Sequence, residues 1–164
     1  MKFSLITFGL VALVSASPLS RRAVFSTSTY DDLSISGGVA GNAQQEALDK
    51  LSGLPSDLST VEEADLDFLN SVNQIANDAE DEAFNTAIDA ASGEDADALQ
   101  RGKIKNKVLK LTATILKLQA QAAQGDDVAD KLDEETTKLN NNISQDEEAA
   151  GLASTFLSFD ATTE

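Results

Sequence analysis

Apolar residues recur at helical spacing over most of the second half of the chain. The clearest stripe lies between positions 61 and 91, and no proline interrupts it. Its members are Val61, Leu69, Val72, Ala76, Ala79, Ala83, Ala87 and Ala91. Ser59 and Glu62 have the spacing of a capping box, and Gly93 suits a helix stop. The pattern predicts one long helix over about 61–91, with a break near Asp78 as the alternative.

A second stripe follows after Gly93. Its apolar residues alternate spacings of four and three, which is heptad spacing: Ile104, Val108, Leu111, Ile115, Leu118 and Ala122. Gly102 weakens this helix by about 1 kcal/mol relative to alanine, and Gly125 ends it. We predict a helix over about 95–124.

Two further helices are expected. Residues 41–52 form a short helix closed by Gly53 and Pro55, and residues 127–149 form a longer one that Asp126 can cap. The flanking stretches, 23–38 and 150–164, alternate apolar and polar residues and are predicted to be extended.

The connections between the long helices are only a few residues long. Short loops between helices of similar length favour antiparallel neighbours. We therefore predict an all-α fold: an antiparallel three-helix bundle plus one short N-terminal helix, with extended N- and C-terminal segments.

The N-terminal residues have the features of a secretory signal peptide. Lys2 precedes an apolar run over 3–14, which is too short for a spanning helix of about 20 residues. Small residues precede a predicted cut after Ala16. Arg21 and Arg22 then resemble a kexin-type dibasic processing site. We expect a signal peptide over 1–16, a pro-segment over 17–22 and a single mature domain over 23–164, secreted and with no membrane span.

Asn142 begins an Asn-Ile-Ser triplet, which is the acceptor pattern for N-glycosylation. Such triplets also occur by chance, and this one lies in a predicted helix. Both a modified and an unmodified Asn142 are therefore compatible with the sequence.

Composition removes most catalytic chemistry. The chain has no Cys and no His, so thiol nucleophiles, a Ser-His-Asp triad and the commonest metal ligands are excluded. The acidic stretches 94–97 and 126–130 are interpreted as helix starts, with no calcium loop. We expect no catalytic residue, no metal and no cofactor, and carboxylate catalysis is the one enzymatic alternative.

A basic stretch stands out in this acidic chain, whose net charge is −16. Residues 101–111, "RGKIKNKVLKL", hold four lysines and an arginine without an acid. A nucleic-acid site is disfavoured by the net charge and by the lack of aromatic residues there. A membrane-binding helix is a second alternative. We favour an internal contact, in which Lys105 and Lys107 flank the seam and pair with acidic neighbouring helices.

This stretch also carries a resemblance. Together with "SGGVAGNAQQEA" at 36–47, "EAFNTAIDAA" at 82–91 and "LNNNISQDEEAAGLAST" near the C-terminus, it resembles a family of fungal small secreted proteins. The resemblance implies an extracellular protein, an effector candidate acting at a cell surface or host interface, without catalytic residues to transfer. A looser similarity, in composition and architecture, is to helical cell-wall mannoproteins and hydrophobic-surface-binding proteins.

Two functions follow as expectations. The first is a secreted, non-enzymatic helical protein that acts through its surface, as a cell-wall component or an effector-like binding protein, with a cell-wall or host-surface component as partner. The alternative is a carrier of an apolar ligand or lipid, held between amphipathic helices with small residues on their seams.

Overall fold

The computed structural model describes residues 22–164. The prediction of an all-α class is confirmed: within these residues there is no strand, only two isolated β-bridges. The helices are α1 (Tyr30–Leu33), α2 (Ala43–Lys50), the 3₁₀ turn η1 (Leu58–Thr60), α3 (Glu63–Asp78), the π-helical segment η2 (Ala79–Phe84), α4 (Asn85–Ala90), α5 (Glu94–Gln124) and α6 (Ala129–Glu148).

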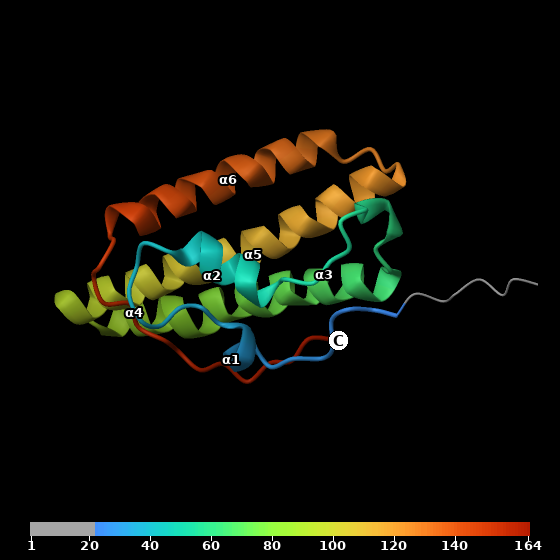
Figure 1. The fold of residues 1–164 in the computed structure, drawn as a ribbon. Helices are drawn as coiled ribbons and strands as arrows, with labels where there is room; N and C mark the ends of the chain where they lie inside the picture. Colours follow the sequence, from blue (N-terminus) through green and yellow to red (C-terminus); the bar gives the residue numbers. More distant parts are fainter. Residues whose placement is uncertain (1–21) are drawn as a thin grey trace, which may run out of the picture.

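Helix α5 lies in the middle of the molecule. It packs along α3 on one side and along α6 on the other, and α2 rests on it as well (Figure 1). Its apolar seam is buried from Ile104 to Leu118, whereas Ala122 is exposed. Helices α3 and α6 make at most marginal contact with each other. A closed three-helix bundle is therefore not confirmed, because α6 is mostly polar and has little apolar surface to bury against α3.

The predicted break near Asp78 is present as a π-helical turn. Helix α3 ends at Asp78, η2 follows, and α4 continues in the same direction. A π-helical turn closes i to i+5 bonds and so holds one more residue than an α-helical turn. The break is an insertion of one residue into a helix that otherwise continues.

Hydrogen bonds between α5 and its neighbour show what this insertion does. The bonds join Lys117 to Asn70 (2.7 Å), Lys110 to Asn77 (3.1 Å) and Lys103 to Asn85 (3.0 Å). The lysines recur every seven residues. The asparagines recur first after seven residues and then, across η2, after eight. The extra residue of η2 thus keeps α4 in register with α5.

The two ends of the chain lie side by side, as Figure 1 shows for the blue and red segments. Tyr30 N–H donates to Ala161 O (2.8 Å), and further along Ala40 N–H donates to Leu152 O (3.0 Å). The N-terminal stretch is not extended throughout, because Thr29 caps α1 by accepting from Asp32 N–H (3.1 Å). The sequence pattern missed this single helical turn.

Two predicted helix caps are wrong. Ser59 lies in η1, where Asp57 accepts from its backbone and hydroxyl groups, and α3 begins only after Glu62. Helix α6 begins at Ala129, after Val128, without a side-chain cap from Asp126. In both places a short turn precedes the helix and takes up the residues that were expected to cap it.

Candidate functional site

Lys105, in the middle of the basic stretch, is almost completely buried, with 1% of its surface exposed. Its ammonium group donates to Gly37 O (2.8 Å) and Val39 O (3.0 Å) and forms an ion pair with Glu46 (2.9 Å). A buried ammonium group requires such partners, since leaving it unpaired would be costly. Lys105 therefore holds the N-terminal segment and α2 against α5.

Arg101 and Gly102, one helical turn before Lys105, contact the other end of the chain. Arg101 donates to Ala153 O and pairs with Glu94 (2.6 Å). A Cβ atom at Gly102 would lie 2.2 Å from Thr155 O, so only glycine permits this close approach of the C-terminal segment. The glycine that weakens the helix thus has a packing function.

Asn106 continues the set of internal contacts. Its amide accepts from the Tyr30 hydroxyl (2.9 Å) and donates to Ala76 O (2.8 Å), and both side chains are fully buried. Burial raises the pKa of Tyr30 and keeps the hydroxyl protonated as a donor. The network connects the N-terminal segment, α5 and the end of α3.

Lys107 and Lys110 share one carboxylate, Glu80 in η2, at 3.2 Å and 2.7 Å. Burial alone would raise the pKa of Glu80, but the hydrogen bonds and charges of the two lysines outweigh it and lower this pKa. The basic stretch therefore forms internal contacts, as predicted, and pairs with the preceding helical stretch through Glu80 of η2. Its ion pair with Glu46 of α2 was not predicted. The expected pairing with α6 is absent from the described residues, because the α6 acids pair with Lys131 and Lys138 of their own helix.

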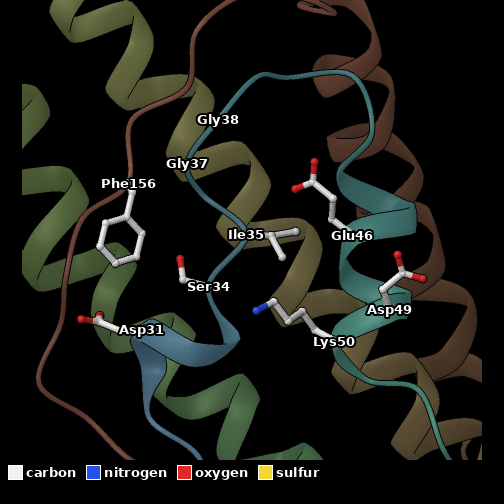
Figure 2. Close-up of a pocket in the computed structure, with 9 residues that line it drawn as sticks. All are labelled: Asp31, Ser34, Ile35, Gly37, Gly38, Glu46, Asp49, Lys50 and Phe156. Atoms are coloured by element: carbon white, nitrogen blue, oxygen red, sulfur yellow. The ribbon is translucent and has the colours of Figure 1, made fainter.

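A surface pocket of about 580 Å³ lies beside these contacts (Figure 2). It is formed by α1, the loop that follows it, α2 and the C-terminal segment. The lining residues are Asp31, Ser34, Ile35, Gly37, Gly38, Glu46, Asp49, Lys50 and Phe156. The pocket combines the apolar side chains of Ile35 and Phe156 with three carboxylates and one ammonium group, that of Lys50, which donates to Asp32 O.

The three rim carboxylates already have structural partners. Asp31 accepts from Phe159 N–H (3.0 Å) and from a serine hydroxyl, Glu46 pairs with Lys105, and Asp49 accepts from the Gln45 amide (2.8 Å). Phe156 is 44% exposed, whereas Ile35 is buried. The geometry suits non-covalent binding of a ligand with an apolar part and a positive charge.

The processing residues are only partly covered by the structure. Ala16 and Arg21 lie outside the described residues, and Arg22 is exposed at the beginning of the described chain. Signal-peptide cleavage and dibasic processing remain predictions.

Asn142, the predicted glycosylation acceptor, lies on α6 and is 9% exposed. Its side-chain nitrogen donates to Lys138 O (2.8 Å). A glycan attached to this nitrogen would occupy a hydrogen-bonded, largely buried position, and the folded chain leaves little space for it there. Glycosylation of Asn142 remains untested.

Sequence reasoning missed the pocket. Glu46 and Asp31 belong to ordinary polar stretches, and only tertiary contacts bring them to one place. Within residues 22–164, no group of acidic side chains is arranged to hold a metal ion. The same part of the chain contains no helix that combines the length and apolar character needed to cross a membrane.

No curated protein and no solved structure matches the chain. One family model, described as a domain of unknown function, DUF8454, matches residues 25–158. This match covers α1 to α6 and both paired terminal segments except the last residues, and the chain therefore belongs to the DUF8454 family.

Proposed function

We propose that this protein is a secreted, non-enzymatic binding protein that acts through its surface. The proposal includes cleavage after Ala16 and Arg22, kinship with fungal small secreted proteins and a cell-wall or host-surface partner. In this proposal, the long helical stretches pack as an antiparallel bundle, and the loops and terminal segments lie at its surface.

The pocket of Figure 2 is the observation that carries the binding role. Its carboxylates Asp31, Glu46 and Asp49 already accept hydrogen bonds or pair with Lys105, which leaves them poorly placed to transfer protons. They still add negative charge to the rim, while Ile35 and Phe156 provide apolar contact. A ligand with a cationic group next to an apolar group complements this surface.

The test uses the mature chain and an aromatic amine, phenethylamine, as probe. We expect the probe to shift the backbone amide NMR signals of Ile35, Glu46 and Phe156. The Phe156→Ser variant should weaken binding several-fold, whereas Leu152→Ser, which alters a similarly exposed residue of the same segment, should not. Shifts scattered over the whole surface, or equal losses in both variants, would count against the pocket.

Secretion and processing are tested by the intact mass of the protein from its own culture medium. A mass that begins at Ala23 supports the proposed processing, and an added mass that contains N-acetylhexosamine and is removed by peptide N-glycosidase would identify glycosylation at Asn142. A mass that retains residues 1–16 contradicts secretion by this route.

The alternative, contact with an apolar ligand or surface, is favoured by one feature of the structure. Val39, Leu152 and Phe156 are exposed large apolar residues on the paired terminal segments. Native mass spectrometry of the secreted protein should then detect a bound lipid. A ligand-free mass, with a melting temperature that fatty acid leaves unchanged, would contradict the carrier function.

A further inference from the structure

A second hollow lies on a different part of the molecule, where α3 and α6 flank α5. Because α3 and α6 scarcely touch, α5 forms the floor between them. Two neighbouring cavities, of about 430 Å³ and about 250 Å³, share Asn73 and Glu135 as lining residues. Together they form one groove, which we call the lysine-asparagine groove.

The groove is a basic site on an acidic protein. Five lysines line it: Lys107, Lys110, Lys117, Lys131 and Lys138. The carboxylates paired with these lysines are Glu80, Glu134 and Glu135, so lysines outnumber them locally. The whole chain has a net charge of −16, but the field of its more distant acids is screened beyond about 8 Å at physiological ionic strength. A small anion in the groove therefore interacts mainly with these lysines.

The lysines retain donors for a ligand. An ammonium group has three N–H donors. Among the described contacts, Lys107 uses one partner, Glu80, and is 34% exposed at its side chain. Lys138 has two partners, both on its own helix, and is 49% exposed. Lys107 on the α5 floor and Lys138 on the α6 wall both line the groove, and each can donate to an oxyanion without giving up a buried contact.

Amide groups supply a different kind of partner. Asn73 donates to Thr114 (2.8 Å) and Asn142 to Lys138 O, and each leaves its side-chain oxygen without a partner among residues 22–164. Asn141 is exposed on the rim. Amides both donate and accept, which suits hydroxyl groups. No aromatic side chain is among the residues that line the groove, so the stacking that nucleic-acid bases require is missing.

We propose that the lysine-asparagine groove binds an acidic saccharide, with Lys107 and Lys138 on its oxyanion and the asparagine amides on its hydroxyl groups. The groove is separate from the pocket of Figure 2, so this proposal stands or fails independently of the binding role assigned to that pocket.

The binding test uses the mature chain and four probes at physiological ionic strength, where the distant acids of the chain are screened. Digalacturonate carries carboxylates, glucose 6-phosphate carries a phosphate, maltose is neutral, and a short oligothymidylate is the nucleic-acid probe. We expect one or both acidic sugars to bind with a Kd of about 0.1–1 mM and to shift the amide NMR signals of Asn73, Lys110 and Asn142. Which of the two binds more tightly identifies the oxyanion.

Matched variants locate the binding. Lys107→Gln and Lys138→Gln should each weaken binding of the acidic sugar about tenfold, and Lys107→Arg should retain it. Lys103→Gln is the control, because Lys103 lies on the same helix and donates to Asn85 but does not line the groove. All variants are first checked for an unchanged melting transition.

Four results would overturn the proposal. They are no binding of either acidic sugar, equal binding of maltose, tighter binding of the oligothymidylate, and an equal loss of affinity in Lys103→Gln. An equal loss of affinity in Lys103→Gln would indicate that any surface lysine attracts the acidic sugar to a similar degree.

Discussion

At the scale of single residues, one short stretch of α5 holds the two ends of the chain. Gly102 admits the C-terminal segment, Lys105 binds the carbonyls of the N-terminal segment, and Asn106 bonds to Tyr30. The charge of this stretch raised nucleic-acid and membrane binding as alternatives, and the sequence favoured an internal contact. The most buried members of the stretch satisfy polar groups that packing removes from water.

Replacing Lys105 by methionine should lower the free energy of unfolding by about 3 kcal/mol, because Glu46 and two carbonyl groups lose their buried partner. Lys103→Met, which removes one contact to Asn85 from a less buried position, should cost less than about 1 kcal/mol. Urea unfolding of both variants measures the difference. Equal losses would contradict the role assigned to Lys105.

Gly102→Ala should also destabilise the protein, by about 1–3 kcal/mol, because the added methyl group collides with Thr155 O. Helix propensity taken alone predicts the opposite, a gain of about 1 kcal/mol. The sign of the change in melting temperature therefore decides between tertiary packing and local preference.

The pH dependence of Glu80 follows from its lowered pKa. A carboxyl group whose pKa is lower in the folded than in the unfolded state stabilises the fold above its unfolded pKa, here 4.5, and this contribution is lost as the pH falls through the folded pKa. The difference in free energy of unfolding between the wild type and Glu80→Gln should thus be large at about pH 6 and vanish at about pH 2.

The chain holds 28 acidic residues, so the difference between the two proteins is the informative quantity. Glu82→Gln, at an exposed neighbouring position, is the control and should show no such trend. A constant difference for Glu80→Gln across this range would refute the assigned pairing with Lys107 and Lys110.

At the scale of elements, the π-helical segment η2 sets the register between α4 and α5. It adds one residue between Asn77 and Asn85, so both asparagines meet lysines that lie seven residues apart on α5. A regular α-helix through this stretch would turn Asn85 about 100° away from Lys103.

Deletion of the exposed Glu82 should therefore be tolerated. Removing one residue converts η2 into an α-helical turn and leaves the faces of α3 and α4 aligned, so we expect the melting temperature to change by less than about 5 °C. Deletion of Asp67, an equally exposed residue of the regular helix α3, should prevent folding because it rotates the buried face. Circular dichroism melts of the two deletions provide the comparison.

At the scale of the whole molecule, the terminal segments complete the core. Tyr30 is fully buried and packs edge-on against Phe159, with ring centroids 5.8 Å apart. Closer to the N-terminus, Phe25 stacks on Phe68 of α3, with ring centroids 4.5 Å apart. A fold without disulfides thus uses its two ends to cover the side of α3 and α5 that α6 leaves open.

Removing residues 159–164 should lower the free energy of unfolding by at least about 2 kcal/mol, since Phe159 and the bonds of Thr163 to Ser28 are lost. Hydrogen exchange should increase first in α1. The substitution Asp160→Asn, at an exposed position of the same segment, should leave stability unchanged. Unaltered exchange in α1 after truncation would contradict the covering role.

Local pattern was sufficient for the longer helices, although it missed α1. Periodic apolar residues and the glycines at 93 and 125 placed α3 to α6 within a few residues, because these signals act over one or two helical turns. The absence of Cys and His likewise excluded whole classes of chemistry from the sequence alone.

Only the tertiary structure decided how the helices and the chain ends combine. The pairing of the two terminal segments, the partners of Lys105 and the lysine-asparagine groove each join residues far apart in the sequence. No local period encodes such contacts, since they depend on which faces of α5 its neighbours leave uncovered. The basic stretch illustrates both contributions. Its sequence predicted an internal contact, and the tertiary structure determined that the contact is with α2, η2 and the ends of the chain.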